Sequence, residues 1–128
     1  ADFEQAAGIK PGDSYNAIWL DLARRRDGQP SILADAKLDM TQWPAAVVRL
    51  LLGQQTPGAT LLDADNPDAT KKSEQVCEAN FYIAEFQRLQ HRDDEALRLY
   101  RLALGGCPRD FIEYTAATNA LRAMGKAP

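Results

Sequence analysis

The fold predicted for this chain rests on the stretch EALRLYRLALGGCP, residues 95–108. Its Ala96, Tyr100 and Ala103 recur at the spacing of one helical face. Small alanines let a second helix approach closely, and the tyrosine ring fills the space beside them. Pro108 prevents the helix from continuing, because proline has no amide hydrogen to donate. The stretch therefore predicts a helix that packs closely against a second helix and ends before Pro108.

Helix signals also occur along the rest of the chain. Apolar residues at helical spacing, with polar caps before them and glycines or prolines after them, mark each one. They predict helices at 13–27, 31–38 and 44–53, a short one from 56, a longer one from Asp68 or Thr70 to Leu89, and a last one from Pro108 to Gly125. No alternating β-branched segment lies between hairpin turns, so the pattern favours an all-α fold.

The beginning of the chain repeats part of this pattern. Segment 3–11 places an aromatic residue, an alanine and a proline at the same spacings as segment 100–108. We interpret residues 1–8 as the end of a helix, and the chain as the C-terminal portion of a longer repeat protein. The prediction is one helical domain over residues 1–128, with its clearest repeat at 77–108, stacked as an α-solenoid and closed by a C-terminal capping helix.

Charge and hydropathy exclude two classes of partner. Of 128 residues, 15 are Lys or Arg and 18 are Asp or Glu, so the net charge is -3. Such a chain has no excess positive field to hold phosphates, and we expect no nucleic-acid partner. No apolar run approaches the ~18 residues of a membrane span. We therefore expect membrane association only through a lipid anchor outside this segment.

The two cysteines are predicted to be neighbours. Cys77 precedes Leu89 by 12 residues, and Cys107 follows Asp93 by 14. In an antiparallel hairpin that turns at residues 90–92, these positions return to the same height, because each helical residue rises ~1.5 Å. A disulfide is the favoured interpretation and requires an oxidising compartment. Two buried thiols are the alternative, and zinc is disfavoured because His91 would lie at the other end of the hairpin.

No catalytic or metal-binding set emerges from the remaining polar residues. Glu78 and Glu85 are seven residues apart on one helical face, a spacing that acid–base chemistry could use, but a solvated or partner-facing stripe is the favoured interpretation. The acidic segment 63–68 matches only three ligand places of a calcium loop and predicts a turn. We expect no cofactor, no metal and no enzymatic activity, with an envelope hydrolase using Glu78 and Glu85 as the alternative.

The chain resembles tetratricopeptide repeat proteins, and among them the C-terminal part of bacterial envelope lipoproteins of the NlpI type. The similarity extends over nearly the whole chain and includes the second-half repeat residues Ala96, Tyr100 and Pro108. The other motifs are IWLDLA at 18–23, Trp43 with LLLG at 50–53, NFYIAEF at 80–86 and FIEY at 111–114. The first half of the repeat departs from the pattern, with Asn80 where a tryptophan is expected.

This resemblance implies a noncatalytic adaptor or scaffold. Its members are dimers that bring peptidoglycan hydrolases to a protease in the periplasm, so the partners would be proteins or peptides, including a second copy. The first helix of such a hairpin usually lines the concave groove. The implied partner-binding residues are Glu78, Phe81, Glu85 and Arg88. A segment that caps or dimerises a longer solenoid is the alternative function.

Overall fold

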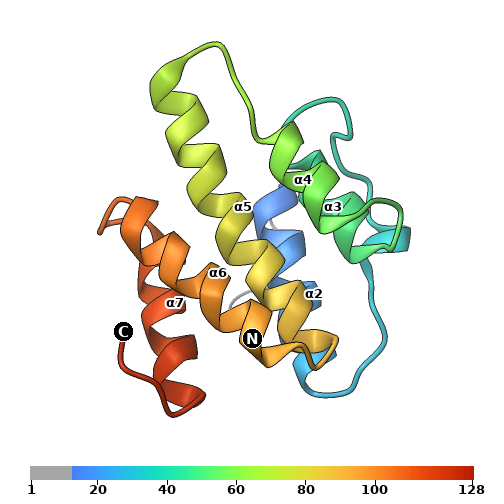
Figure 1. The fold of residues 1–128 in the computed structure, drawn as a ribbon. Helices are drawn as coiled ribbons and strands as arrows, with labels where there is room; N and C mark the ends of the chain where they lie inside the picture. Colours follow the sequence, from blue (N-terminus) through green and yellow to red (C-terminus); the bar gives the residue numbers. More distant parts are fainter. Residues whose placement is uncertain (1–12) are drawn as a thin grey trace. The chain divides into compact units, whose positions relative to one another are not determined.

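The computed structural model describes residues 13–128 of the protein. These residues contain six α-helices and one 3-10 helix and no strand, which confirms the all-α prediction for this part of the chain (Figure 1). The chain divides after Thr56 into two compact units. A single domain over residues 1–128 and its solenoid stacking stay predictions. The predicted helix end at residues 1–8 lies outside the described residues.

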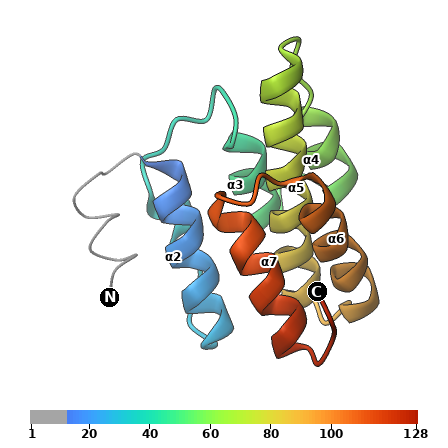
Figure 2. The same ribbon diagram turned by 90° about the vertical axis from the view of Figure 1, so that its left-hand side faces the viewer.

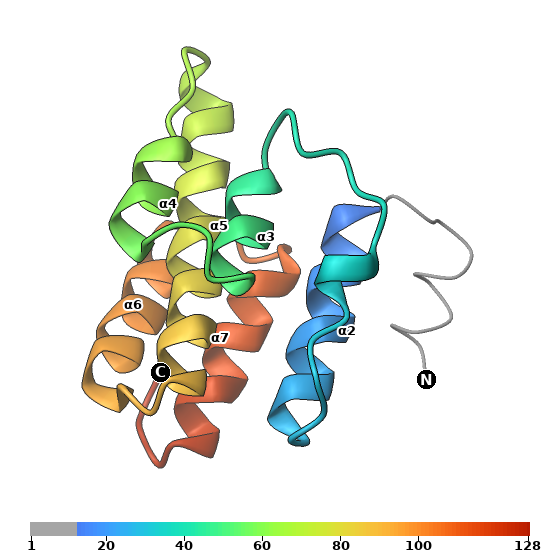
Figure 3. The same cartoon turned by 90° about the vertical axis from the view of Figure 1, so that its right-hand side faces the viewer.

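The first unit contains α2 (Ser14–Arg26), η1 (Leu33–Asp35) and α3 (Ala45–Leu51). Asp13 caps α2 by accepting a hydrogen bond from the Asn16 amide at 3.3 Å. Figure 3 shows the chain of η1 passing beside α2. Helices at both predicted places, 13–27 and 44–53, are thus confirmed with bounds shifted by one or two residues.

The predicted helix at 31–38 is wrong except for the single turn of η1. Asp21, which is fully buried on α2, accepts a hydrogen bond from the Ser31 hydroxyl at 2.6 Å and another from the Ile32 amide at 3.0 Å. These bonds fix the start of the segment beside α2. A buried carboxylate needs such donors, and this requirement outweighs the weak local preference for a helix.

The second unit contains α4 (Pro57–Asp63), α5 (Ala69–Leu89), α6 (Asp93–Gly106) and α7 (Ile112–Ala123). Helix α5 packs against each of the other three, and α6 also packs against α7. Figure 2 shows α7 running beside α5, and Figure 3 shows α4 along the first half of α5. Asp68 caps α5 by accepting from the amides of Thr70 and Lys71 at 2.9 and 3.0 Å. The longest helix therefore begins where its capping residue predicts.

The antiparallel pair of α5 and α6, here called the hairpin, turns at His91. The backbone of His91 is left-handed, with φ 61°, and the Arg92 amide donates to the Gln87 carbonyl at 2.9 Å. This is the helix-ending motif in which glycine is usual, because other residues lose about 1–2 kcal/mol in this conformation. The corresponding positions after α2, α3 and α7 are glycines, with φ of 76° or 77°.

Replacing His91 with glycine is expected to stabilise the protein by about 1 kcal/mol, because the left-handed turn would no longer hold a side chain. Urea unfolding followed by circular dichroism measures this change. His91→Ala is the control, since alanine keeps the Cβ and should give no gain. An unfolding free energy that His91→Gly leaves unchanged or lowers would contradict the account of the turn.

The opposite end of the hairpin is closed by the cysteines. The sulfur atoms of Cys77 and Cys107 are 1.99 Å apart and their Cα atoms 4.8 Å apart, which confirms the predicted pairing. Beside them, the inner face of α6 is buried as its spacing predicts, through Ala96, Tyr100 and Ala103. The quoted stretch therefore packs on α5 and ends at a covalent link to it.

Removing the disulfide is expected to lower the free energy of unfolding by about 3 to 4 kcal/mol, because the link closes a loop with a sequence separation of 30. Denaturant unfolding with and without a reductant measures the loss. A Cys77→Ala, Cys107→Ala double variant should be equally destabilised and insensitive to the reductant. If the wild-type protein is also insensitive, no such bond forms.

Candidate functional site

The four residues predicted to line a groove lie on α5 but do not share one environment. Glu78 and Arg88 are half-buried, whereas Phe81 is 1% exposed and Glu85 5% exposed. The ring of Phe81 lies 6.0 Å from the ring of Tyr100 between centroids, so this side chain faces α6. Phe81 and Glu85 therefore do not share an open surface with Glu78 and Arg88. Partner binding through Glu78 and Arg88 stays a prediction.

Glu85 has a partner inside the hairpin. The hydroxyl of Tyr100 on α6 donates a hydrogen bond to Oε2 of Glu85. Burial raises the pKa of Tyr100, the charge of Glu85 and this hydrogen bond raise it further, and Arg88 opposes them. The hydroxyl is thus protonated at neutral pH. Because Tyr100 already engages the carboxylate of Glu85, this residue is poorly placed to share acid–base work with Glu78.

A second tyrosine–glutamate pair joins α5 to α7. The Tyr82 hydroxyl donates to Oε2 of Glu113 at 2.7 Å, and Glu113 is only 4% exposed. Neither pair is predicted by the spacing of residues in the sequence. The only signal in the sequence was the presence of tyrosines and glutamates on the predicted helices. Exposed helix surfaces often carry the same residues, so this signal does not indicate a buried pair.

Tyr100→Phe is expected to lower the free energy of unfolding at pH 7 by about 1–3 kcal/mol, because buried Glu85 loses a donor. This deficit should shrink by roughly 1.4 kcal/mol per pH unit above pH 10. The reason is that Tyr100 in the unfolded wild type ionises near its ordinary pKa of 10.0, whereas the folded state holds its proton.

Urea titrations of both proteins from pH 7 to 11.5 measure this difference, and other ionising groups cancel between them. A deficit that stays constant above pH 10 would contradict the raised pKa of Tyr100.

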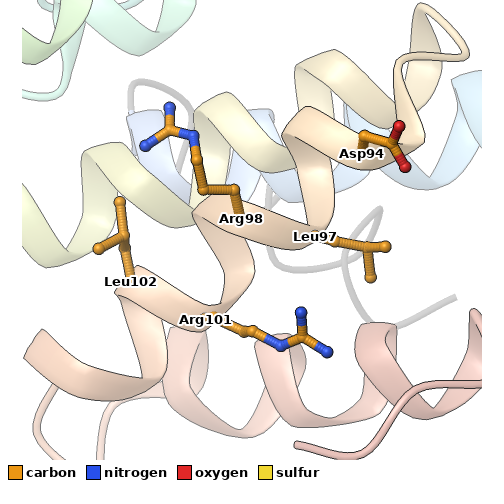
Figure 4. Close-up of a pocket in the computed structure, with 5 residues that line it drawn as sticks. All are labelled: Asp94, Leu97, Arg98, Arg101 and Leu102. Carbon is orange, nitrogen blue, oxygen red and sulfur yellow. The ribbon is translucent and has the colours of Figure 1, made fainter.

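The solvent-facing side of α6 carries an open hollow of about 510 Å³. Figure 4 shows its side chains projecting from one helix. We call this surface the α6 outer face and define it as Asp94, Leu97, Arg98, Arg101 and Leu102.

Leu102, on the α6 outer face, is 47% exposed. Arg98 pairs with Glu95, which raises the pKa of Arg98 and lowers that of Glu95. Arg101 forms no ion pair with any described residue. The α6 outer face thus combines two apolar side chains with one cation, Arg101, that forms no ion pair with a described residue.

Residues 13–128 offer neither a metal-binding cluster nor a membrane-spanning helix. Within this range, no group of three or more His, Cys, Asp or Glu side chains could hold a metal ion. The helices of the same range are all too short or too polar to cross a bilayer.

Comparison with known proteins adds no assignment. No family model matches the chain, and no solved structure matches it. The resemblance to tetratricopeptide repeat proteins therefore stays a prediction.

Proposed function

We propose that this chain is a noncatalytic protein–protein interaction module of a scaffold or adaptor in the bacterial cell envelope. It would recruit partners such as peptidoglycan hydrolases or proteases. The observation that carries the proposal is the α6 outer face, where Leu97 and Leu102 flank Arg98 and Arg101. Protein interfaces favour arginine and exposed apolar side chains in this combination.

The packing of α6 within the second unit supports a binding role for the α6 outer face. The inner face of α6 is packed through Ala96, Tyr100 and Ala103, so the helix is held in place from one side. Its opposite side can then contact a partner without the loss of a core contact. A side chain such as Arg101 can serve as an interface anchor, because its long apolar stem and planar cation both contribute to binding.

The proposed compartment rests on the cysteine pair and on the resemblance. Disulfides persist in secreted and periplasmic proteins and are rare where thiols are kept reduced. The pair Cys77–Cys107 is compatible with such an oxidising compartment.

The proposal is tested by affinity capture from the envelope fraction of the native host, with quantitative mass spectrometry. Arg101→Glu with Leu102→Glu is expected to reduce recovery of a defined partner by at least about tenfold, the equivalent of ~1.4 kcal/mol. Arg122→Glu with Ala123→Glu is the matched control, because both residues are exposed on α7. Equal recovery by wild type and both variants would contradict the role of the α6 outer face.

Self-association is the second candidate function, favoured by the charge order of the same face. Asp94 and Arg101 are seven residues apart, with Leu97 near the midpoint. Two antiparallel copies of α6 would therefore bring Asp94 of each copy to Arg101 of the other.

Sedimentation equilibrium distinguishes this candidate. Asp94→Arg and Arg101→Asp should each give monomers through like-charge contacts, and an equimolar mixture should restore a heterodimer. If the wild-type protein stays monomeric at 1 mM, its free energy of association is weaker than roughly -4 kcal/mol. That result would eliminate self-association as the function.

A further inference from the structure

A second hollow, of about 310 Å³, lies between α5 and the end of α6, beside the disulfide. Its volume is at the lower end of the range of roughly 300–1,000 Å³ that small-molecule sites occupy. All of its lining residues belong to the second unit. Those used below are Lys72, Ser73, Val76, Cys77, Asn80 and Gly106.

The amide of Asn80 is the feature that points to a ligand. Asn80 is 9% exposed and forms no side-chain hydrogen bond with any described residue. Every fully enclosed side-chain nitrogen or oxygen in the described range has a partner, so the Asn80 amide must still reach solvent, and the hollow that it lines provides the opening. An asparagine side chain offers two donors and one acceptor together. One group that satisfies both kinds at once is another amide, as in a peptide main chain.

The other walls suit an extended peptide. Ser73 and Asn80 are seven residues apart on one face of α5, with Val76 and Cys77 as an apolar surface between them. Gly106 lies in the last turn of α6, where carbonyl groups lack helical donors and can accept from a ligand N–H. The hollow thus offers polar groups on both sides of an apolar surface. The polar groups can bond the main chain of an extended peptide, and the apolar surface can contact the side chains on one of its two sides.

Lys72 adds a positive charge at one end of this surface. Its Nζ lies 3.2 Å from Oδ1 of Asp65, and the two side chains are 55% and 71% exposed. An exposed pair of this kind contributes little stability, so a ligand carboxylate can replace Asp65. Eight helical residues separate Lys72 from Asn80, about 12 Å, which three or four residues of an extended peptide would span.

We propose that this hollow binds a short extended peptide that carries a carboxylate. A peptide main-chain amide bonds to Asn80, an apolar side chain packs on Val76 and Cys77, and the carboxylate meets Lys72. The proposal rests on the proposed function only in taking the ligand to be a protein segment. It does not use the α6 outer face.

Three acetylated tripeptides test the proposal by ¹⁵N NMR titration of the full chain. They are acetyl-Gly-Leu-Ala with a free carboxyl terminus, the same peptide amidated, and amidated acetyl-Gly-Leu-Asp. At least one carboxylate-bearing peptide should shift the Asn80 side-chain amide and the Gly106 amide, with Kd on the order of 1 mM. The neutral peptide should bind at least about fivefold more weakly.

The arms of the titration separate the sources of the carboxylate. A response to the free terminus alone assigns a protein C-terminus, and a response to the aspartate peptide alone assigns an acidic side chain. Equal affinity for the neutral peptide overturns the role of Lys72. No shift at Asn80 with any peptide overturns the site, and a continued loss of partner capture by the α6 outer-face variant would leave the proposed function standing.

Asn80→Leu separates binding from folding. It should abolish the peptide shifts at Ser73 and Gly106 yet raise Tm by about 3 °C, because an apolar group replaces an amide that is 9% exposed and has no hydrogen bond to a described residue. A structural asparagine would instead lower Tm on substitution. Asn119→Leu, at an exposed position of α7, is the matched control for both readouts. Unchanged peptide affinity in Asn80→Leu overturns the proposal.

Discussion

The second unit depends on the requirement that a buried carboxylate must have hydrogen-bond donors. Helix α5 takes part in two such hydrogen bonds, one with α6 and one with α7. Its Glu85 accepts from Tyr100 of α6, and its Tyr82 donates to Glu113 of α7. Sliding either neighbour by one turn would break one of these hydrogen bonds to a buried carboxylate. The two tyrosines thus fix the register of α6 and α7 on one central helix, which apolar packing alone specifies less sharply.

The same rule acts independently in the first unit. Asp21 is fully buried and is satisfied by Ser31 and Ile32, which follow α2 in the chain. Arg25, four residues from Asp21, donates to the Leu51 carbonyl at 2.9 Å and links α2 to the end of α3. This network explains why residues 31–38 form only one 3-10 turn although their composition suits a helix.

The sequence was sufficient for features set by local spacing. Helical periodicity, the capping residue Asp68 and the rise per residue together predict α5, α6 and the pairing of Cys77 with Cys107. It was insufficient for buried polar groups. Glu85 is 15 residues from the tyrosine that satisfies it, and Glu113 is 31 residues from its own. Before these partners are placed, a glutamate on a helix has the same pattern whether it faces solvent or a core.

The candidate sites show the same division. The polar and apolar order of the α6 outer face can be read from residues 94–102, but whether another helix covers it depends on the fold. Asn80 could be noticed as a departure from the repeat pattern, because it occupies a place where a tryptophan is expected. Its unpartnered amide becomes visible only when Gly106 and Cys107 are placed beside α5.

The two ends of the hairpin give these surfaces their rigidity. At one end the chain turns within a few residues at His91, and at the other Cys107 is bonded to Cys77. Helix α6 is therefore held at both termini, so its backbone would need little further ordering in the proposed binding. Fixing a surface before binding reduces the entropy lost on association. Because Cys77 also forms part of the wall beside Asn80, the bond that stabilises the hairpin shapes the smaller hollow as well. The stability of the hairpin and the proposed peptide binding would thus depend on one covalent link.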